Sequence, residues 1–252
     1  MTVLIEHKSG YTLGTEELLV EQTLKSQGKS YSIAGLSQLE RGRVRSIDSS
    51  LVVGTLPFIK AALRERGLIM AMENTYPQSL MPFMHRNVWR ERLSHALDRA
   101  EMGRKCFTKP SERAKRFTGL VLESGSDWRV GGVPRSEPVW SSDLVTWRSE
   151  WRVYVRNNEI AFCGHYSGDK GIEPDYFQVS IMMAAYSAAN VGHGSYAMDV
   201  GVLECGQTAL VEMNDGFAIG AYDQIPGDVY LEFLQSRWNE MTYRTENPEQ
   251  RQ

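Results

Sequence analysis

Short apolar runs alternate with amphipathic segments over about the first 80 residues, and no other feature restricts the fold as strongly. Leu18, Leu19 and Leu24 recur at near-helical spacing after the first apolar run. Pro57 stands at the start of a second helical segment, where its missing N–H removes no hydrogen bond. Strands that alternate with helices favour a small parallel sheet. The predicted strands are Val3–Ile5, Tyr31–Ala34, Ser50–Gly54 and Leu68–Met72, and the predicted helices are Glu16–Leu24 and Phe58–Arg66.

The pattern changes to longer strands in the rest of the chain. A helix is predicted over Asn87–Met102, whose apolar residues share one face, and a second over Pro174–Asn190. We place a domain boundary near Pro82–Arg86 and expect units at 1–84 and 85–243, followed by a flexible tail at 244–252 without large apolar side chains. The predicted strands are Lys105–Lys109, Leu120–Glu123, Val139–Val145, Glu150–Val155, Ile160–His165, Tyr196–Leu203 and Ala209–Met213.

Composition excludes several classes of protein. With 252 residues, of which 42% are hydrophobic, the chain can bury a full core. The net charge of -3 argues against a uniformly basic nucleic-acid binder. No apolar run approaches the roughly 18 residues of a membrane span, and the first residues lack the pattern of a signal peptide. Three cysteines without a C-x-x-C pair fit a reducing compartment, so we expect a soluble cytoplasmic protein.

The common catalytic motifs are missing from the sequence. It contains no P-loop, no H-E-x-x-H and no G-x-S-x-G. Gly192–Ala197 matches G-x-G-x-x-A, but a predicted helix precedes it and a predicted strand follows it. A dinucleotide site needs the opposite order, so we give this match no role in cofactor binding.

Two carboxylates are expected to face each other on a hairpin. If the turn is centred on Cys205–Gly206, the numbers of paired residues sum to 411, and Asp199 then lies opposite Glu212. Asn214 shares the face of Glu212 because side chains alternate along a strand. Like charges in direct opposition destabilise a sheet unless something positive lies between them, and Mg²⁺ is commonly held by such oxygen ligands. The alternative is a hairpin whose acids point to solvent.

Positive charge is concentrated in residues 86–116, where ten Lys and Arg stand against four acids. From Asp199 to the end, ten acids stand against three basic residues. A basic segment that faces an acidic metal site suits a metal-bound polyphosphate. A solvated charged loop and a nucleic-acid contact are the alternative interpretations.

With these residues in view, the chain resembles the ATP-grasp superfamily, in particular its compact clade named for two arginines and a lysine. The resemblance implies a mixed α/β and α+β protein, in which two α+β subdomains clasp ATP and a small Rossmann-like domain precedes them. The segments that carry it are Cys106–Pro110 with Lys115–Gly119, Ser149–Val155, Asp199–Gly201 and Val211–Gly216.

The resemblance also implies how ATP is bound. Lys109 resembles the strand lysine that reaches the phosphates, and 111–119 resembles the flap that covers them, although Lys115 and Arg116 stand where the family usually has Gly and Ser. Ser142–Val145 looks like the hinge whose backbone contacts adenine, with an Asp where Glu is usual. Glu150 stands where the family has its ribose-binding acid. The implied nucleotide-binding residues are Lys109, Lys115, Asp143, Leu144, Val145 and Glu150.

Three further residues match the family's ligands for Mg²⁺, namely Asp199, Glu212 and Asn214. The implied catalytic residues are Arg152, Lys109 and Arg86. Arg152 would meet the γ-phosphate or the substrate carboxylate, and Arg90 could replace Arg86 as the second arginine of the clade.

The function implied by the resemblance is that of an ATP- and Mg²⁺-dependent carboxylate–amine ligase, which works through an acylphosphate and releases ADP and phosphate. Its substrates would be a small-molecule or peptide carboxylate and an amine, and its partners would include neither membranes nor, by the charge balance, nucleic acid. Two alternatives stay open. One is an ATP-grasp kinase that phosphorylates without ligation, and the other is a non-catalytic nucleic-acid-binding protein that uses residues 86–116.

Overall fold

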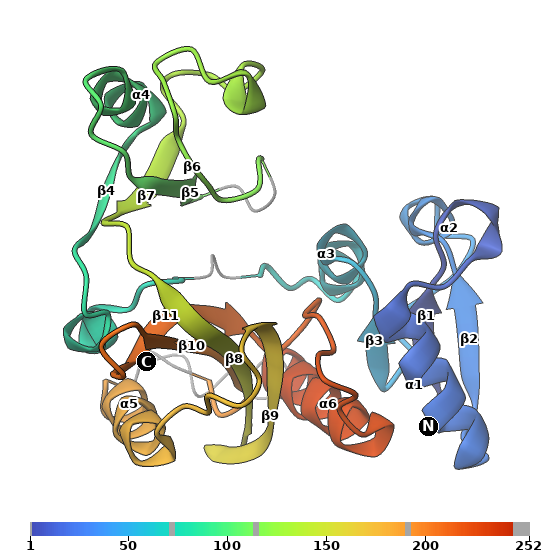
Figure 1. Cartoon of the computed structure of the whole chain (residues 1–252). Helices are drawn as coiled ribbons and strands as arrows, with labels where there is room; N and C mark the ends of the chain where they lie inside the picture. Colours follow the sequence, from blue (N-terminus) through green and yellow to red (C-terminus); the bar gives the residue numbers. More distant parts are fainter. Residues whose placement is uncertain (1, 71–73, 113–115, 190–192, 244–252) are drawn as a thin grey trace.

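The chain begins with a parallel three-stranded sheet, as the alternation predicts. A computed structural model describes residues 2–70, 74–112, 116–189 and 193–243. The strands β1 (Val3–Glu6), β2 (Tyr31–Ala34) and β3 (Leu51–Val53) pair in the order β2-β1-β3. The 3₁₀ turn η1 (Ser9–Tyr11) and the helices α1 (Thr15–Ser26), α2 (Leu36–Glu40) and α3 (Leu56–Glu65) connect and flank them (Figure 1).

The predicted strand over Leu68–Met72 is wrong for the part that the structure describes. Leu68–Met70 is irregular, and the side chain of Ile69 is 95% exposed. Residues 71 and 72 lie outside the described residues. An apolar run without a neighbouring strand has no partner for its backbone groups, so hydrophobicity alone misplaces it.

A second sheet is antiparallel and has the order β4-β7-β5-β6. Helix α4 (Leu93–Glu101) packs on it, with the core residues Leu93, Leu97 and Val139 between them. The 3₁₀ turn η3 (Trp128–Val130) adds to the same core. The strands are β4 (Val88–Arg92), β5 (Phe107–Pro110), β6 (Leu120–Val121) and β7 (Pro138–Ser142).

The helix predicted over Asn87–Met102 is therefore wrong in its first third. All five residues of β4 pair with β7, and the helix starts only at Leu93. Trp89 lies on the strand, and the guanidinium of Arg99 stands 5.0 Å from its ring centroid. Trp89 and Leu93 are four residues apart, a spacing typical of a helix that a strand followed by a helix can also produce.

A third sheet has longer strands and the order β11-β10-β8-β9, with antiparallel neighbours. The expected bounds of β10 are confirmed to the residue. The elements are β8 (Trp147–Arg156), β9 (Glu159–Gly168), β10 (Tyr196–Leu203), β11 (Thr208–Asp215), α5 (Tyr176–Ala188), α6 (Gly227–Tyr243) and the 3₁₀ turn η2 (Gln78–Phe83).

Helix α6 lies between the first and third sheets (Figure 1). Its residues Tyr230, Phe233 and Trp238 share one apolar core with Ile5 of β1 and Tyr154 of β8. The proposed division at residue 84 stays a prediction, but the first sheet completes its core with residues from near the end of the described chain. None of the helices in the described parts is long and apolar enough to cross a membrane.

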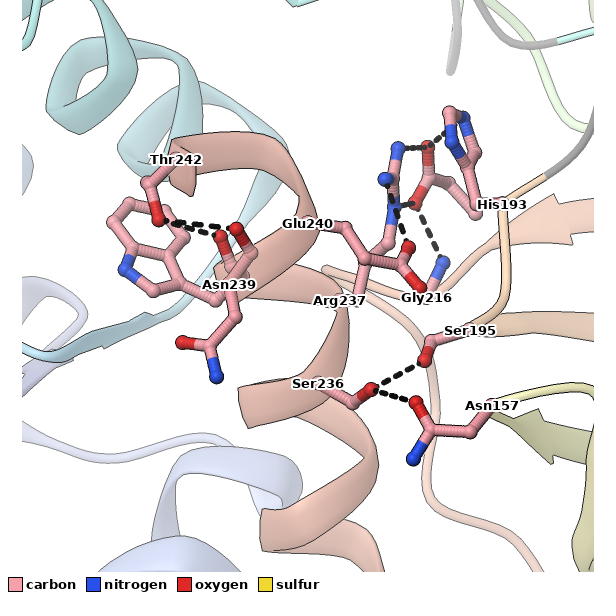
Figure 2. Close-up of polar contacts among 11 residues, drawn as sticks. Asn157, His193, Ser195, Gly216, Ser236, Arg237, Asn239, Glu240 and Thr242 are labelled. Atoms are coloured by element: carbon pink, nitrogen blue, oxygen red, sulfur yellow. Dashed lines mark hydrogen bonds and ion pairs between the residues drawn. The ribbon is translucent and has the colours of Figure 1, made fainter. Parts of the chain in front are cut away.

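Polar contacts fix α6 on the third sheet (Figure 2). The hydroxyl of Ser236 donates to Asn157 Oδ1 at 3.0 Å and accepts from Ser195 Oγ at 2.7 Å. Arg237 binds Asp215, at the end of β11, through two nitrogens, and its Nη2 lies 2.7 Å from Oδ2. These bonds connect the helix to the end of β11 and to the loop residues next to β8 and β10, in the sheet that carries the candidate site.

Candidate active site

The hairpin of β10 and β11 brings Asp199 and Glu212 face to face, as predicted. The predicted register holds from Tyr196 to Asp199, and a bulge after Asp199 then moves the pairing by one residue, so that Val200 lies opposite Leu210. A bulge of this kind bends a strand and redirects the side chains beside it. Asp199 therefore lies beside a bulge in the otherwise regular pairing of β10 with β11.

Asp199 also has a partner on its other side, Arg152 of β8. Arg152 donates from Nε to Oδ1 and from Nη2 to Oδ2, each at 2.7 Å. Arg152 is 7% exposed and Asp199 3%, so the pair is almost fully buried. Burial lowers the pKa of Arg152, but the hydrogen bonds and charge of Asp199 outweigh it and raise that pKa above its ordinary value. Arg152 thus carries a permanent positive charge in the centre of the sheet.

Lys109 reaches this row of side chains from the second sheet. It lies on β5, is 9% exposed, and forms an ion pair with Glu212. Its Nζ lies 4.4 Å from the ring centroid of Tyr76, a cation–π distance. Burial lowers the pKa of Lys109, while Tyr76 and Glu212 raise it, and the net shift is upward. Lys109 and Glu212 thus connect two sheets with a charged contact.

Each of the two acids has a positively charged protein side chain as its partner. Arg152 neutralises Asp199, and Lys109 neutralises Glu212. Asn214 adds a hydrogen bond from Nδ2 to Asp199 Oδ2 at 3.1 Å. The interpretation of the hairpin as solvent-facing is therefore wrong for Asp199, although the side chain of Glu212 keeps 27% exposure.

Two tyrosines that sequence reasoning missed extend the site along the third sheet. The ring of Tyr222 lies 4.7 Å from the guanidinium carbon of Arg152, and it stacks on Tyr166 with 5.1 Å between centroids. The hydroxyl of Tyr166 donates to Glu150 Oε2 at 3.1 Å. Burial is the main cause that raises the pKa of Tyr166. No local motif marks these tyrosines, because their stacking joins segments more than 50 residues apart.

Arg86 lies beside the hairpin without pairing to an acid of the site. It donates to the carbonyl oxygens of Leu210 at 2.7 Å and Val211 at 2.9 Å, and lies 5.3 Å from the ring centroid of Trp147. It therefore holds the strand next to Glu212. Arg90, the alternative, forms an ion pair with Glu112 on the surface.

The residues predicted to form the hinge, Ser142–Val145, lie where the chain passes from the second to the third sheet. The carboxylate of Asp143 accepts from the backbone N–H of Asn87 at 3.1 Å and from its side-chain amide at 2.6 Å. These bonds join the residue before β4 to the residue after β7. Leu144 is 48% exposed, and Val145 comes shortly before β8. Lys115 lies outside the described residues.

The donor set suits a hard divalent cation. Asp199, Glu212 and Asn214 offer oxygen atoms from neighbouring positions of one hairpin, which is the ligand chemistry of Mg²⁺. Among the described residues, no three His, Cys, Asp or Glu side chains gather closely enough to hold a metal by themselves. A cation here would rely on two carboxylates, one amide oxygen and oxygens of a bound ligand, as Mg²⁺ often does.

Comparison with known proteins identifies the sequence family that this geometry fits. The matching family model is that of an ATP-grasp domain, family 2 of the clade named for two arginines and a lysine, and it matches residues 83–231. No protein of curated function matches the chain in sequence.

Similar folds occur among solved structures. The D-cycloserine synthetase DcsG has a TM-score of 0.62 and 12% identity, over 96% of this chain and 100% of that chain. A RimK domain protein ATP-grasp from Sphaerobacter thermophilus has a TM-score of 0.56 and 15% identity, over 94% and 99%. A D-alanine–D-alanine ligase from Bacillus anthracis has a TM-score of 0.55 and 12% identity, over 99% of both chains. At these identities the likeness is one of fold.

Proposed function

The chain belongs to the ATP-grasp superfamily, in the clade named for two arginines and a lysine, and from this premise we propose that it is an ATP- and Mg²⁺-dependent ligase that joins a carboxylate to an amine. In the proposed reaction, the substrate carboxylate attacks the γ-phosphorus of ATP, and ADP leaves. The amine then attacks the acyl carbon of the resulting acylphosphate, the C–N bond forms, and phosphate leaves. The proposed carboxylate and amine are small molecules or peptide groups.

One observation carries this proposal. Glu212, Asp199 and Arg152 stand in a row on three neighbouring strands, and Lys109 reaches the row from another sheet. Phosphoryl transfer requires little covalent chemistry from the protein and depends on positive groups that stabilise charge on the transferred group. Buried cations do this best, because interactions between charges are stronger away from water.

Each residue of the row has a proposed task. Lys109 binds the ATP phosphates, and Arg152 stabilises the negative charge that develops on the transferred phosphoryl group. Mg²⁺, held by Asp199, Glu212 and Asn214, would neutralise further phosphate charge. Arg86 and Tyr222 act by position, since the first holds the backbone of β11 and the second lies against Arg152. Glu150, Asp143, Leu144 and Val145 stay candidates for contacts with ribose and adenine, as does Lys115 for the phosphates.

Trapping the acyl intermediate tests the reaction itself. We expect ADP and phosphate as products, and hydroxylamine should convert the activated acid to a hydroxamate when a carboxylate substrate is present. The measurement is colorimetric detection of hydroxamate over a panel of acids, together with nucleotide chromatography. A stable phosphorylated product without hydroxamate or amide would favour a kinase, and AMP as the main product would contradict the acylphosphate.

The metal site has its own test. Glu212→Gln should lose most of the increase in ATP affinity that Mg²⁺ produces, because an amide is a weaker ligand than a carboxylate. Calorimetric titration of ATP with and without Mg²⁺ measures this increase. The matched control is Glu204→Gln, an exposed acid in the turn of the same hairpin. If both variants respond to Mg²⁺ like the unchanged protein, Glu212 is not a ligand.

The described part of the basic segment gives little support to a nucleic-acid surface. Arg90, Arg99 and Lys105 form ion pairs with acids, and Lys109 points to Glu212. Cations that already have partners contribute less to the release of counterions on which such binding depends.

A further inference from the structure

Tyr154 is fully buried on β8, close to the candidate active site. Its side chain is 0% exposed and lies on the same face of the third sheet as that of Arg152, two residues earlier on the strand. Its ring packs against Tyr230 and Phe233 of α6, with centroid distances of 6.4 and 5.4 Å. Because these contacts fix the ring, they also fix the position of its hydroxyl.

The hydroxyl of Tyr154 makes two hydrogen bonds to one loop. It donates to the carbonyl oxygen of Gly220 at 2.7 Å and accepts from the backbone N–H of Tyr222 at 2.9 Å. Burial raises the pKa of Tyr154 to about 12, so at neutral pH the hydroxyl keeps the proton that it donates. A hydroxyl can donate and accept, and both capacities are used here. The side chain therefore ties the backbone of residues 220–222 to β8.

The loop of residues 216–226, between β11 and α6, has an unfavourable backbone conformation. Ala218 and Gln224 have φ values of 49° and 55°, in the left-handed region that residues other than glycine adopt only where the surrounding structure enforces it. Tyr230 donates to the carbonyl oxygen of Ile219 at 2.5 Å. The shape of this loop thus depends on bonds from side chains outside it.

Tyr222 reaches Arg152 from this loop. Its ring lies 4.7 Å from the guanidinium carbon and stacks on Tyr166. Asp199 accepts from Nε and Nη2 of Arg152, whereas Nη1 makes no hydrogen bond in the part of the chain that the structure describes. Nη1 is therefore the nitrogen that can donate to a ligand. The carboxylate holds the guanidinium from one direction, and the tyrosine ring restrains it from a second.

We propose that Tyr154 is a positioning residue, whose hydroxyl holds Tyr222 against Arg152 and so fixes the direction of Nη1. The role of this arrangement in catalysis rests on the ligase function proposed above, in which Arg152 stabilises charge on the transferred phosphoryl group. Such stabilisation requires a donor that is already oriented when the charge develops. Tyr154 acts through Tyr222 and Arg152, without a contact of its own to the reacting atoms.

Nuclear magnetic resonance of Arg152 tests the positioning directly and needs no nucleotide. An aromatic ring shifts the resonances of nearby protons, so the Nε–H signal of Arg152 reports where the ring of Tyr222 lies. Tyr222→Leu gives the position of this signal without the ring, and Arg152→Lys identifies the signal by its loss. We expect Tyr154→Phe to move the signal most of the way to its position in Tyr222→Leu. An unchanged signal would overturn the proposal.

Tyr230→Phe is the matched control. It removes another buried tyrosine hydroxyl, which bonds the same loop at Ile219 but does not bond Tyr222. Each of the two variants keeps its ring and leaves a carbonyl oxygen of the loop without its donor, so both should lower the melting temperature. Only Tyr154→Phe should move the Arg152 signal. Equal displacement in both would show that the loop responds to any lost bond and that Tyr154 has no particular role.

A mimic of the transferred phosphoryl group tests the consequence for catalysis. The mimic is ADP with Mg²⁺ and aluminium fluoride, and calorimetric titration compares its affinity with that of ATP and Mg²⁺. Tyr154→Phe should weaken the mimic about tenfold and ATP less than about threefold, because a misplaced catalytic group affects the transition state more than the ground state. Equal changes for the two ligands would contradict a role in catalysis.

A double variant tests whether Tyr154 acts through Tyr222. Tyr222→Leu alone should also weaken the aluminium fluoride complex about tenfold. If one residue acts through the other, the two losses do not add. Combining Tyr154→Phe with Tyr222→Leu should then again cost about tenfold in affinity, and not about a hundredfold. Additive losses would contradict the proposed route through Tyr222.

These outcomes are separable from that of the ligase proposal. A displaced Arg152 signal with equal effects on the two nucleotide complexes would confirm the positioning and contradict the catalytic task of Arg152. Hydroxamate formation with an unchanged Arg152 signal would leave the ligase proposal intact and remove the role of Tyr154.

Discussion

Asp199→Asn should lower the free energy of unfolding by about 3–5 kcal/mol, because it leaves a buried arginine without its counter-charge. Arg152 and Asp199 are 7% and 3% exposed and share two hydrogen bonds of 2.7 Å. The side chain of asparagine has one oxygen, which can replace only one of the two carboxylate oxygens as an acceptor. It carries no charge to balance that of Arg152. Urea denaturation, followed by tryptophan fluorescence, measures the change.

Glu212→Gln is the control for this first prediction. The side chain of Glu212 keeps 27% exposure, so its ion pair with Lys109 is only partly buried. We expect a loss of about 1–3 kcal/mol, smaller than that of Asp199→Asn because this pair is only partly buried. Considered without their partners, the two opposed acids would predict that either substitution relieves repulsion. Equal and small effects in the two variants would support that view over the buried pair.

Lys109→Met should weaken ATP binding about ten- to a hundredfold, the typical value of a charge-assisted phosphate contact. Lys109 is 9% exposed and lies at the meeting point of two sheets, where a bound phosphate would be largely shielded from water. Methionine retains most of the side-chain volume while removing the charge. Calorimetric titration with ATP and Mg²⁺ gives the affinity.

Lys105→Met serves as the matched control, since Lys105 precedes the same strand but forms an exposed ion pair with Glu123. Its effect should stay below about threefold, as expected for a screened surface charge. Equal losses in the two variants would indicate that general positive charge, and not the position of Lys109, attracts the nucleotide.

Sequence reasoning succeeds where a pattern is local. The bounds of β10 and the pairing of Asp199 with Glu212 follow from alternation and from one turn. The family resemblance is likewise confirmed, because its motifs are short segments in a characteristic order.

Sequence reasoning fails where a contact depends on the order of strands in a sheet. Arg152 lies next to Asp199 only because β8 and β10 are neighbours, although β9 and α5 separate them along the chain. Tyr222 depends on a loop whose position is set by bonds to the distant side chains of Tyr154 and Glu16. Helix α6 escaped prediction altogether, and its packing partners begin at the first strand.

The position of α6 has a consequence for folding while the protein is being synthesised on the ribosome. Its first residue, Gly227, follows the last strand of the first sheet, Leu51–Val53, by about 170 residues. At a synthesis rate of about 5–20 residues per second, the ribosome needs roughly ten seconds or more to make that intervening stretch. Until α6 is made, the apolar part of the first sheet's core that packs against it is uncovered. That apolar part is where a chaperone would bind the growing chain, and release would follow the emergence of Tyr230, Phe233 and Trp238.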